Sequence, residues 1–471
     1  MTKHILWTSE EVSQILNAKS KTAWKATGVS IDTRTIEKGD IFVAIKGDRF
    51  DGSEFVKEAL LKGAVAAISE KKIDGVKKDA SVLVVDDALE ALVKLAKARR
   101  ENTKAKLIAV TGSVGKTSVK EAIRAVLEDQ GETYANKGNL NNHIGLPLSI
   151  CRMPKEAKYG VFELGMNHAG ELSHLTAILR PHVAVVTTVE AVHLEFFDSV
   201  EGIAEAKAEI MEGVDKKGSV VLNRDNAYFP ILKKKAASLG IKDVRAFGRH
   251  KDAKYRLIDT TITPQGIKVE ADIGGEKLKY QLKTFGTHHA QNSVAVLAAI
   301  SAAGANIEKA TKTLGKITAE KGRGRLHHLK LGGKVFTLID DSYNASPASI
   351  RAGLEVLSTL KKISGGRTVA VLGDMRELGD ESEKLHKSLI GDVVDNKIDR
   401  VYCAGNFMKY LFDGLPKGKQ ARHATEPLAL LGILERQIEN NDIVMIKGSN
   451  GTGTWKLVDA LIADADEAKM K

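Results

Sequence analysis

The sequence predicts an α/β protein with three domains, at residues 1–103, 104–321 and 322–471. Three observations support this fold class. The chain has 471 residues, and at about 100–200 residues per domain this length corresponds to about three domains. Short apolar runs alternate with segments of helical period, which is typical of parallel βαβ units. Most of these runs end in a polar, often glycine-containing loop, as expected where ligands bind at the carboxyl ends of parallel strands.

The predicted elements differ from domain to domain. In the first, we expect strands at Asp40–Ile45 and Ser81–Val85, helices at Gly52–Lys62 and Leu89–Arg100, and a charged connector at Lys97–Lys106. In the second, we expect a helix at Ser118–Glu128 and strands at Leu107–Val110, Gly160–Leu164, Val183–Val189 and Val220–Asn223. In the third, strands are predicted at Val335–Ile339, Thr368–Leu372, Arg400–Cys403 and Ile443–Ile446. The first domain is then a small α/β unit and the third a Rossmann-like one.

Composition and charge exclude several classes of protein. Apolar residues make up 43% and charged residues 28% of the chain, so disorder is not its main state. The net charge of +11 suits an anionic partner, but charge alone does not separate nucleic acid from nucleotides or acidic small molecules. The two cysteines, Cys151 and Cys403, form no disulfide framework. Since the sequence has neither a signal-peptide pattern nor an apolar run of about 20 residues, we expect a soluble cytoplasmic protein without membrane insertion.

A phosphate-binding loop is predicted at residues 110–118, which read VTGSVGKTS between a predicted strand and a predicted helix. The contacting residues are Thr111, Gly112, Ser113, Val114, Gly115, Lys116, Thr117 and Ser118. Its two glycines let backbone N–H groups approach phosphate oxygens, and the helix N-terminus adds positive potential. Lys116 can reach the β- and γ-phosphates, and the Thr117 hydroxyl can bind Mg²⁺. Because Val110 stands where the full Walker pattern has glycine, only half of that motif is present. The second domain is therefore expected to resemble the parallel sheet of P-loop ATPases.

Two alternative functions come from short motifs and from charge. NKID at Asn396–Asp399 and DIGG at Asp272–Gly275 resemble GTPase motifs, but both lie too far along the chain from the phosphate loop for a compact switch domain. We interpret them as chance matches. The charge of +11 also fits a nucleic-acid-dependent ATPase or a P-loop regulator. Aromatic residues are only 5% of the chain and no basic run is interleaved with them, so no base-stacking platform is evident.

Three further side chains follow predicted strands or lie on a predicted helix of the second domain. Glu163 ends a strand that faces the phosphate loop, where a carboxylate is a natural Mg²⁺ ligand. His193 follows the next strand, but a lone histidine is more often structural. Lys207 falls on the apolar stripe of its helix, so its amine either reaches water past the helix or is held at an active site, where it could carry a modified, anionic head group.

Polar loops also follow the strands of the third domain. They read DDSYNAS at Asp340–Ser346, GDMRELG at Gly373–Gly379 and KGS at Lys447–Ser449, and Arg325 lies in the hinge-like stretch KGRGRLHHL. Each loop alone could be a helix cap or a turn. Their recurrence after successive strands favours a ligand site that faces the phosphate loop.

Taken together, these motifs resemble the Mur ligase family of peptidoglycan precursor synthesis. The resemblance covers nearly the whole chain, in order. It rests on DTRTIEKGDIFVAIKGDRFDG, TGSVGKTS, NKGNLNNHIGLPL, FELGMNHAGE, HLE, EAKAEI, GTHHAQN, DDSYNASP, VLGDMRELG and KGS. The combination of NHAGE, DDSYNASP and GDMRELG is similar to the members of the family that use D-alanyl-D-alanine. The resemblance then implies an ATP-dependent ligase that joins this dipeptide to UDP-N-acetylmuramoyl-tripeptide through an acyl phosphate, acting as a monomer and without nucleic acid.

The resemblance also implies roles for individual residues. Lys116, Lys207 and His193 would be catalytic, and two Mg²⁺ ions would be held by Thr117, Glu163, His193 and a carbamylated Lys207. Besides the phosphate loop, ATP would be bound by His288, Asn292, Arg325 and Asp341. The two other substrates would be bound by Asp32, Thr33, Arg34, Gly47, Asn141, Asn142, Asn167, His168, Tyr343, Asn344 and Lys447. The chain departs from the usual pattern at Thr33, Ser53, His289 and Asn450, where the family more often has Ser, His, Asn and Arg.

Overall fold

The computed structural model describes residues 4–47 and 50–468, so Asp48 and Arg49 of the DTRTIEKGDIFVAIKGDRFDG stretch lie outside the described residues. The N-terminal part holds a four-stranded parallel sheet in the order β3-β4-β5-β6 and an antiparallel pair, β1 with β2. The strands are β1 (Trp7–Thr8), β2 (Lys25–Ala26), β3 (Gly28–Ser30), β4 (Asp40–Val43), β5 (Ala66–Ser69) and β6 (Val82–Val84). The helices are α1 (Ser9–Leu16), η1 (Gly52–Phe55), α2 (Val56–Leu61) and α3 (Ala88–Glu101).

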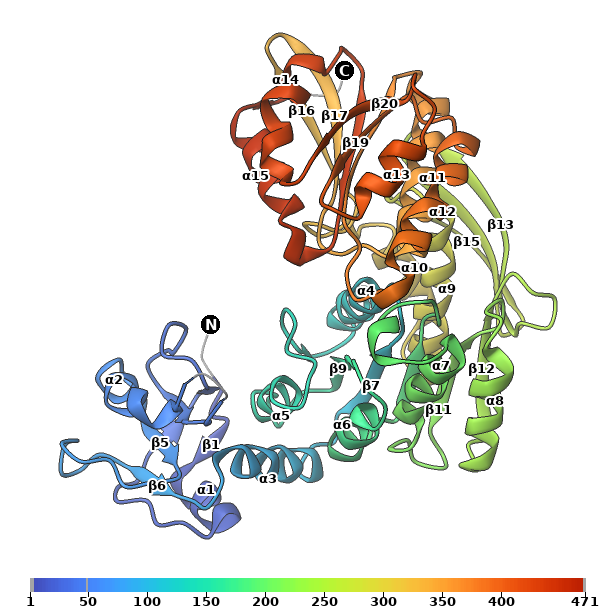
Figure 1. Cartoon of the computed structure of the whole chain (residues 1–471). Coiled ribbons are helices and arrows are strands. Elements are labelled where there is room, and N and C mark those ends of the chain that lie inside the picture. Colours follow the sequence, from blue (N-terminus) through green and yellow to red (C-terminus); the bar gives the residue numbers. More distant parts are fainter. Residues whose placement is uncertain (1–3, 48–49, 469–471) are drawn as a thin grey trace.

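Helix α3 connects this sheet to the next one, as Figure 1 shows. The predicted helix Leu89–Arg100 is confirmed as α3, but the predicted connector Lys97–Lys106 is helical through Glu101, and only four residues separate the helix from β7. Burial of a basic side chain explains the difference. The guanidinium of Arg99 lies 4.2 Å from the ring centroid of Trp7, and its Nη2 donates to the Leu6 carbonyl. A charge pattern alone does not reveal that such a side chain packs inward.

The middle part is built on a nine-stranded sheet in the order β15-β14-β13-β12-β11-β10-β7-β9-β8. The pairs from β8 to β13 are parallel, and the last three strands form an antiparallel meander. The strands are β7 (Lys106–Thr111), β8 (Thr133–Ala135), β9 (Tyr159–Glu163), β10 (Val183–Val186), β11 (Ser219–Asn223), β12 (Asp243–Gly248), β13 (Tyr255–Thr263), β14 (Gly266–Ile273) and β15 (Glu276–Leu282). The helical segments are α4 (Lys116–Glu128), α5 (Gly145–Cys151), α6 (Glu171–Leu179), η2 (Leu194–Phe196), α7 (Val200–Ala208), η3 (Glu209–Met211), α8 (Phe229–Ser238), α9 (Thr287–Ala302) and α10 (Ile307–Leu314).

Helices cover both faces of this sheet, so its central strands are apolar throughout, as expected for a doubly covered parallel sheet. Helix α9 is largely buried against α4 and the strands β10 to β14. On the other side, α6, α7 and α8 pack with the same apolar cluster as α3 and α5. No helix of the described residues is both long and apolar enough to cross a membrane.

The C-terminal part holds a seven-stranded sheet in the order β20-β19-β18-β21-β17-β16-β22. The pairs from β20 to β17 are parallel, and β16 pairs antiparallel with both of its neighbours. The strands are β16 (Arg325–Leu331), β17 (Lys334–Asp341), β18 (Thr368–Gly373), β19 (Arg400–Ala404), β20 (Gln420–Ala424), β21 (Ile443–Lys447) and β22 (Asp466–Glu467). The helical segments are α11 (Pro347–Ser364), η4 (Gly379–Glu381), α12 (Ser382–Asp395), α13 (Met408–Gly414), η5 (Pro427–Leu430), α14 (Leu431–Gln437), η6 (Asn450–Thr452) and α15 (Thr454–Ala463).

The arrangement of the three parts decides where a site can form. In Figure 1 the C-terminal part lies directly above the middle part, while the N-terminal part lies to one side at the far end of α3. The loops after β7, β8 and β10 of the middle part and after β17, β18 and β21 of the C-terminal part line one common cavity, together with Glu163 at the end of β9. Loops at the carboxyl ends of two parallel sheets therefore face each other, as the pattern of polar loops predicted.

Candidate functional site

A cavity of about 930 Å³ lies between the middle and C-terminal parts. Sixteen of the residues predicted for the site line it: Ser113, Val114, Gly115, Lys116, Thr117, Ser118, Asn141, Glu163, His193, His288, Asn292, Arg325, Asp341, Tyr343, Asn344 and Lys447. Ten predicted residues do not: Asp32, Thr33, Arg34, Gly47, Thr111, Gly112, Asn142, Asn167, His168 and Lys207. The cavity thus brings together, from two separate sheets, the predicted ATP-binding residues other than Thr111 and Gly112.

Two glycines of the phosphate loop have positive φ angles and lie close to neighbouring atoms. Gly112 has φ +147°, and a Cβ atom there would lie 1.9 Å from the Thr187 hydroxyl oxygen. Gly115 has φ +86°, and a Cβ atom there would lie 3.0 Å from Nδ2 of Asn292. Helix α4 begins directly after Gly115 and has no side-chain cap on its first N–H groups. These uncapped amides and the helix dipole make an anion-binding site at the floor of the cavity.

Lys116 folds over this loop. Its ammonium donates to the carbonyl of Gly112 at 2.7 Å and, more weakly, to that of Ser113 at 3.4 Å. Burial lowers the pKa of Lys116, and the neighbouring Arg323 lowers it further, while the Glu163 carboxylate opposes the shift. A lysine in this state gains when a phosphate takes the place of the carbonyl partners, because a full negative charge repays the desolvation of the ammonium.

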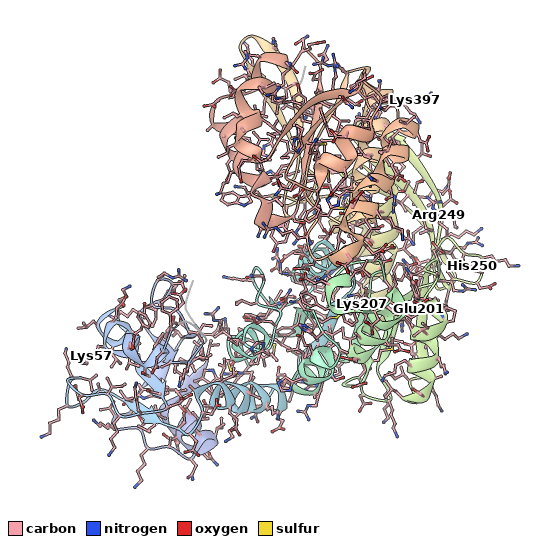
Figure 2. All side chains as sticks on the ribbon, in the orientation of Figure 1. Lys57, Glu201, Lys207, Arg249, His250 and Lys397 are labelled. Carbon is pink, nitrogen blue, oxygen red and sulfur yellow. The ribbon has the colours of Figure 1, made fainter. Side chains whose placement is uncertain are left out.

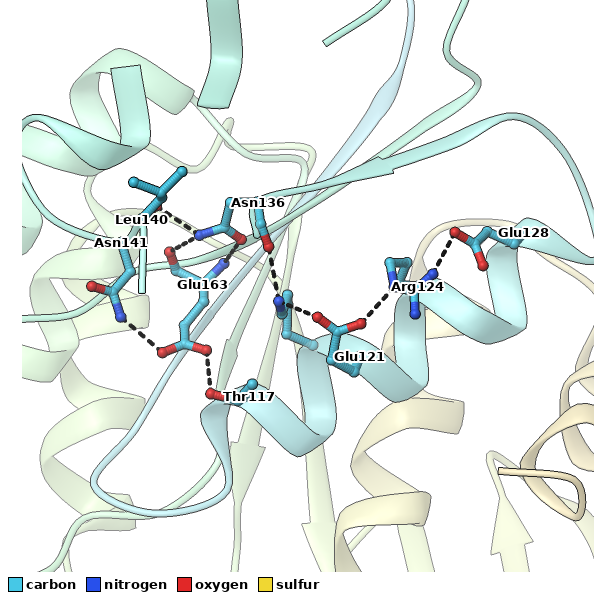
Figure 3. Close-up of polar contacts among 9 residues, drawn as sticks. Thr117, Glu121, Arg124, Glu128, Asn136, Leu140, Asn141 and Glu163 are labelled. Carbon is cyan, nitrogen blue, oxygen red and sulfur yellow. Dashed lines mark hydrogen bonds and ion pairs between the residues drawn. The ribbon is translucent and has the colours of Figure 1, made fainter. Parts of the chain in front are cut away.

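Thr117, Glu163 and Asn141 form a hydrogen-bonded group beside Lys116, in which Glu163 is buried and the other two are half-buried. The Thr117 hydroxyl donates to Oε2 of Glu163 at 2.6 Å, and Nδ2 of Asn141 donates to Oε1 of the same carboxylate at 2.8 Å (Figure 3). Glu163 ends β9 and is only 4% exposed. Hydroxyl and carboxylate oxygens are the ligands that Mg²⁺ prefers. Thr117 and Glu163 therefore offer oxygen donors that would suit a magnesium ion. Within residues 4–47 and 50–468, no three acidic, imidazole or thiol side chains gather as a ready-made metal site.

His193 reaches across to the C-terminal part of the chain. Its backbone is left-handed, with φ +57°, and its Nδ1 lies 2.5 Å from Oε2 of Glu377. Glu377 is also left-handed, with φ +61°, and its hydrogen bond with His193 lowers the pKa of its carboxyl group. Both residues line the cavity. Sequence analysis predicted His193 but missed Glu377, since the loop GDMRELG gave no sign of which residue would meet the imidazole.

Lys207 lies on α7 in the middle part (Figure 2) and is 1% exposed, as its place on the apolar stripe of the helix predicted. Its ammonium forms no hydrogen bond and no ion pair with any residue that the structure describes. Burial, and to a lesser extent the charge of Lys116, hold the pKa of Lys207 well below its usual value. Lys207 is therefore a buried amine whose charged form is disfavoured by burial and by the charge of Lys116.

The C-terminal part brings an ion pair and an arginine to the cavity. Lys447, which ends β21, donates to Oδ2 of Asp341 at 2.7 Å and to the Asn344 carbonyl at 3.0 Å. Burial raises the pKa of Asp341, although Lys447 pulls it the other way. Arg323 lies 4.0 Å from the ring centroid of Tyr343, and its charge acts on Lys116 and on Asp341.

Arg323 was missed by sequence analysis, which singled out Arg325 in the same KGRGR stretch. Both arginines line the cavity, but Arg325 is exposed at the start of β16. The signal that could have separated them is the aromatic Tyr343 in DDSYNAS, because a guanidinium stacks on such a ring. Sequence spacing alone does not show which arginine reaches it.

A second hollow of about 170 Å³ opens beside the phosphate loop between α4, α9 and the segment before β16. Ser118, Asn292 and Arg323 line both cavities.

His288 lines the larger cavity. Burial, and the charges of the neighbouring His289 and of Lys447, hold the pKa of His288 well below its usual value. Its Nδ1 is buried without a hydrogen-bond partner among the described residues. A neutral imidazole with a free nitrogen suits a polar, uncharged ligand group such as a base or a ribose hydroxyl.

The other predicted substrate residues lie outside the cavity. Asn142 accepts the N–H of Gly145, the first residue of α5, at 2.9 Å. His168 lies 3.0 Å from Glu171, and Asn167 donates its N–H to the same carboxylate. In the N-terminal part, Arg34 pairs with Asp32 at 2.6 Å, Thr33 is buried, and Gly47 lies in the same β4–η1 connection as Asp48 and Arg49. The substrate-binding roles of these residues therefore stay predictions.

Comparison with known proteins agrees with this architecture along the whole chain. Three family models match: "Mur ligase family, catalytic domain" at residues 25–100, "Mur ligase middle domain" at residues 110–300, and "Mur ligase, glutamate ligase domain" at residues 324–450. A UDP-N-acetylmuramoyl-tripeptide–D-alanyl-D-alanine ligase of Rickettsia prowazekii is 34% identical over 455 residues, which cover 97% of this chain and 99% of the relative.

Two solved structures share the fold closely. MurF from Acinetobacter baumannii matches with a TM-score of 0.85 and 30% identity, covering 97% of this chain and 99% of that one. MurF ligase from Thermotoga maritima, solved in complex with ADP, matches with a TM-score of 0.80 and 27% identity, covering 93% and 97% of the two chains. Sequence motifs, the three sheets and the facing loops agree with these matches. The chain belongs to the Mur ligase family.

Proposed function

We propose that this chain joins D-alanyl-D-alanine to the terminal carboxylate of UDP-N-acetylmuramoyl-tripeptide, with ATP as the source of energy. The observation that carries the proposal is the single cavity in which the phosphate loop faces the Asp341–Lys447 pair of the other sheet. The relative from Rickettsia prowazekii bears this activity in its name, and the two chains align over nearly their full length. The ADP complex of the Thermotoga maritima protein supports ATP as the nucleotide.

The chemistry explains why the site needs an anion-binding floor. A carboxylate is a poor electrophile, so an oxygen of the tripeptide carboxylate attacks the γ-phosphorus of ATP, and ADP leaves. The nitrogen of the dipeptide amine then attacks the carbonyl carbon of the acyl phosphate, loses a proton, and inorganic phosphate leaves as the amide bond forms. Phosphoryl transfer depends mostly on positioning and charge neutralisation. The α4 amides and Lys116 supply both at the phosphates.

Magnesium fits the oxygen donors that the site offers. Thr117 and Glu163, which already contact each other, would hold one ion. Following the family resemblance, a second ion would be held by His193 together with an oxygen of a modified Lys207. Glu377 is the carboxylate that contacts His193 in the described structure. Bound magnesium neutralises the charge that develops on the phosphates. The residues of the chain would position these metal ligands and the substrate carboxylate relative to one another.

Carbamylation of Lys207 is supported by the state of its side chain. A neutral amine is the form that adds carbon dioxide, and burial favours the neutral form of this amine by lowering its pKa. The product is an anion, and the neighbouring Lys116 attracts an anion where it repels an ammonium. The modification would convert an unpaired buried group into a paired one.

The remaining parts of the proposal concern the outer domains. We assign the UDP end of the precursor to residues 1–103, with Asp32, Thr33, Arg34 and Gly47 as its contacts, the nucleotide to residues 104–321, and the dipeptide to residues 322–471. Asn141, Asn142, Asn167 and His168 would face the peptide of the precursor. We place the enzyme in the cytoplasm, because ATP is one substrate and both cysteines are free and buried. That it acts as a monomer rests on the family resemblance alone.

The decisive experiment is ADP formation measured with each substrate omitted in turn. We expect release only when ATP, Mg²⁺, the UDP-linked tripeptide and D-alanyl-D-alanine are all present, and mass spectrometry should find the UDP-linked pentapeptide. Tripeptides ending in diaminopimelate or in lysine serve as alternative acceptors. Lys116→Ala should lower the rate at least about 100-fold, because it removes a charge-assisted contact to the transferred phosphate. Stimulation of ATP hydrolysis by nucleic acid in place of the dipeptide would contradict the proposal.

A further inference from the structure

Helix α4 carries a second lysine whose place in the fold is unusual. Lys120 lies one turn after Lys116, and its side chain is fully buried. Its Nζ donates to the backbone carbonyl of Asn136 at 2.9 Å and pairs with the carboxylate of Glu121. A buried ammonium is costly unless it is fully paired, so these contacts point to a specific task. The reaction as described above uses no contact from this residue.

Asn136, the partner of Lys120, lies where the pairing between β8 and β9 stops. The ladder ends at Ala135 opposite Val161. Beyond it, the Asn136 side chain takes the place of a strand: its Oδ1 accepts the N–H of Glu163 at 2.9 Å, and its Nδ2 donates to the Glu163 carbonyl at 3.1 Å. Nδ2 also donates to the Leu140 carbonyl at 2.9 Å. One side chain therefore holds both backbone groups of Glu163 and the loop that follows β8.

The contacts close into a ring that starts and ends on α4 (Figure 3). From Lys120 they pass to the Asn136 backbone, through its side chain to Glu163, and from the Glu163 carboxylate to the Thr117 hydroxyl at 2.6 Å. The same carboxylate accepts from Asn141, and the Asn141 carbonyl accepts the N–H of Gly165. Lys120, Asn136 and Glu163 are each at most 4% exposed. Glu163 is thus held against Thr117 both by their direct hydrogen bond and by the contacts through Asn136 and Lys120.

We propose that Lys120, acting through Asn136, is a positioning residue that fixes Glu163 against Thr117 for the metal and holds Asn141 toward the cavity. The inference rests on the proposed function, because it concerns the same metal and substrate site. Lys120 touches neither substrate nor metal. Its effect passes through a hydrogen bond to the backbone that carries the ligand, and outer partners of this kind usually change metal affinity or activity about 10- to 100-fold when they are lost.

The chain offers a matched control in Arg124. This arginine lies one turn after Lys120 on α4 and binds the other oxygen of Glu121 at 2.5 Å, but no contact joins it to Asn136. Lys120→Met and Arg124→Met therefore both remove a cationic partner of Glu121. Only Lys120→Met removes the donor to the Asn136 carbonyl. Asn136→Ala is the second test variant, because it releases Glu163 and leaves Lys120 in place.

The first measurement is the binding of Mn²⁺ with ADP, followed by electron paramagnetic resonance, so it does not depend on turnover. We expect the dissociation constant of Mn²⁺ to rise about 10- to 100-fold in Lys120→Met and Asn136→Ala and to stay within about twofold in Arg124→Met. The second measurement is steady-state activity. The Mg²⁺ concentration for half-maximal rate and the KM for the UDP-linked tripeptide should rise, while the KM for D-alanyl-D-alanine should not change.

Two results would overturn the inference. One is Mn²⁺ binding by Lys120→Met at wild-type strength, and the other is an equal loss of affinity for all three substrates, which a merely structural role would produce. If circular dichroism finds Lys120→Met unfolded, Asn136→Ala decides by the same criteria. An inactive wild-type enzyme that still shows these differences in Mn²⁺ binding would contradict the proposed function and leave the positioning role standing.

Discussion

The imidazole of His193 lies 2.5 Å from the carboxylate of Glu377, and this contact joins the middle sheet to the C-terminal sheet. Both residues have left-handed backbones, at φ +57° and +61°. Non-glycine residues adopt this conformation at a cost, which the surrounding structure must offset. The same interface brings the N–H of Glu195 to the Glu377 carbonyl at 3.4 Å. His193, the proposed metal ligand, is therefore oriented by Glu377 of the C-terminal part, to which the dipeptide is assigned.

Glu377→Gln tests this relationship. The variant keeps a hydrogen-bonding side chain but removes the charge that orients the imidazole, and we expect kcat to fall about 10-fold, in the range found for partners of metal ligands. Glu381→Gln is the control, because Glu381 is an exposed acid in the neighbouring segment whose partner is Lys384. Equal kcat values for the two variants would show that the contact has no part in the reaction.

The direction of the pKa shift of Glu377 predicts how its contact with His193 depends on pH. The hydrogen bond with His193 lowers the pKa of Glu377 below its usual value near 4.5. The ionised carboxylate of Glu377 stabilises the folded protein through its contact with His193. This stabilisation is fully present above pH 4.5 and is lost as the pH falls through the lowered pKa. We expect wild-type and Glu377→Gln unfolding free energies to differ at neutral pH and to converge in acid. A constant difference down to about pH 3 would contradict this.

Much of the fold could be predicted from sequence periodicity, and some of the site could not. The strands and the phosphate loop follow from apolar runs and glycines, and the burial of Lys207 follows from its place on the stripe of α7. The antiparallel meander of β13 to β15 was not predicted, because its strands alternate polar and apolar residues and contain no apolar run. Alternation with a period of two is itself typical of a strand with one buried face, so these strands were missed because only continuous apolar runs were taken as strand signals.

Contacts between distant loops were the part that sequence reasoning missed. Asn136 bonds to Glu163, 27 residues away, and His193 bonds to Glu377, 184 residues away. No local pattern encodes such partners, since their pairing depends on how two strand ends or two sheets are placed. The resemblance to a family supplied the candidate ligands, but not the residues that contact and orient them.

Lys207→Met should separate stability from activity. Methionine fills the buried position without an amine, so we expect the fold to be kept or stabilised. Since the folded-state pKa of unmodified Lys207 lies well below its usual value, the unfolded chain binds a proton that the folded chain does not. Stability of the unmodified wild-type protein should therefore rise with pH up to about pH 10.5, and this component should vanish in Lys207→Met.

The carbamate itself has a direct readout. Wild-type enzyme equilibrated with ¹³C-bicarbonate should show a carbamate resonance by NMR that is absent from Lys207→Met, and the variant should lose at least about 100-fold in kcat, as expected when a metal ligand is removed. Lys233, on the neighbouring helix α8, provides a control site for lysine-to-methionine replacement. Full activity in Lys207→Met would remove the second metal ion from the proposal.

The Asp341–Lys447 pair should be worth more to stability than the many exposed pairs of this basic chain. Removing Lys447 leaves the Asp341 carboxylate without its partner in a buried place. The Asp341 side chain keeps 24% of its surface exposed, so we expect Lys447→Met to cost about 2–4 kcal/mol, somewhat less than a fully buried pair. Lys409→Met, which breaks an exposed pair with Asp413, should cost less than about 0.5 kcal/mol. Urea unfolding of both variants measures the difference, and equal midpoints would contradict it.

Arg323 provides the sharpest comparison between the sequence and the structure. Its guanidinium stacks on Tyr343 at 4.0 Å and lies close enough to Lys116 to affect its pKa, whereas Arg325 is exposed. A charge-assisted hydrogen bond to a phosphate contributes about 1.5–3 kcal/mol, so Arg323→Gln should lower kcat/KM for ATP at least about 10-fold. Tyr343→Phe keeps the aromatic face and should stay within about twofold. If Arg325→Gln alone impairs ATP use while Arg323→Gln does not, the assignment taken from the family resemblance holds and the one drawn from the geometry is wrong.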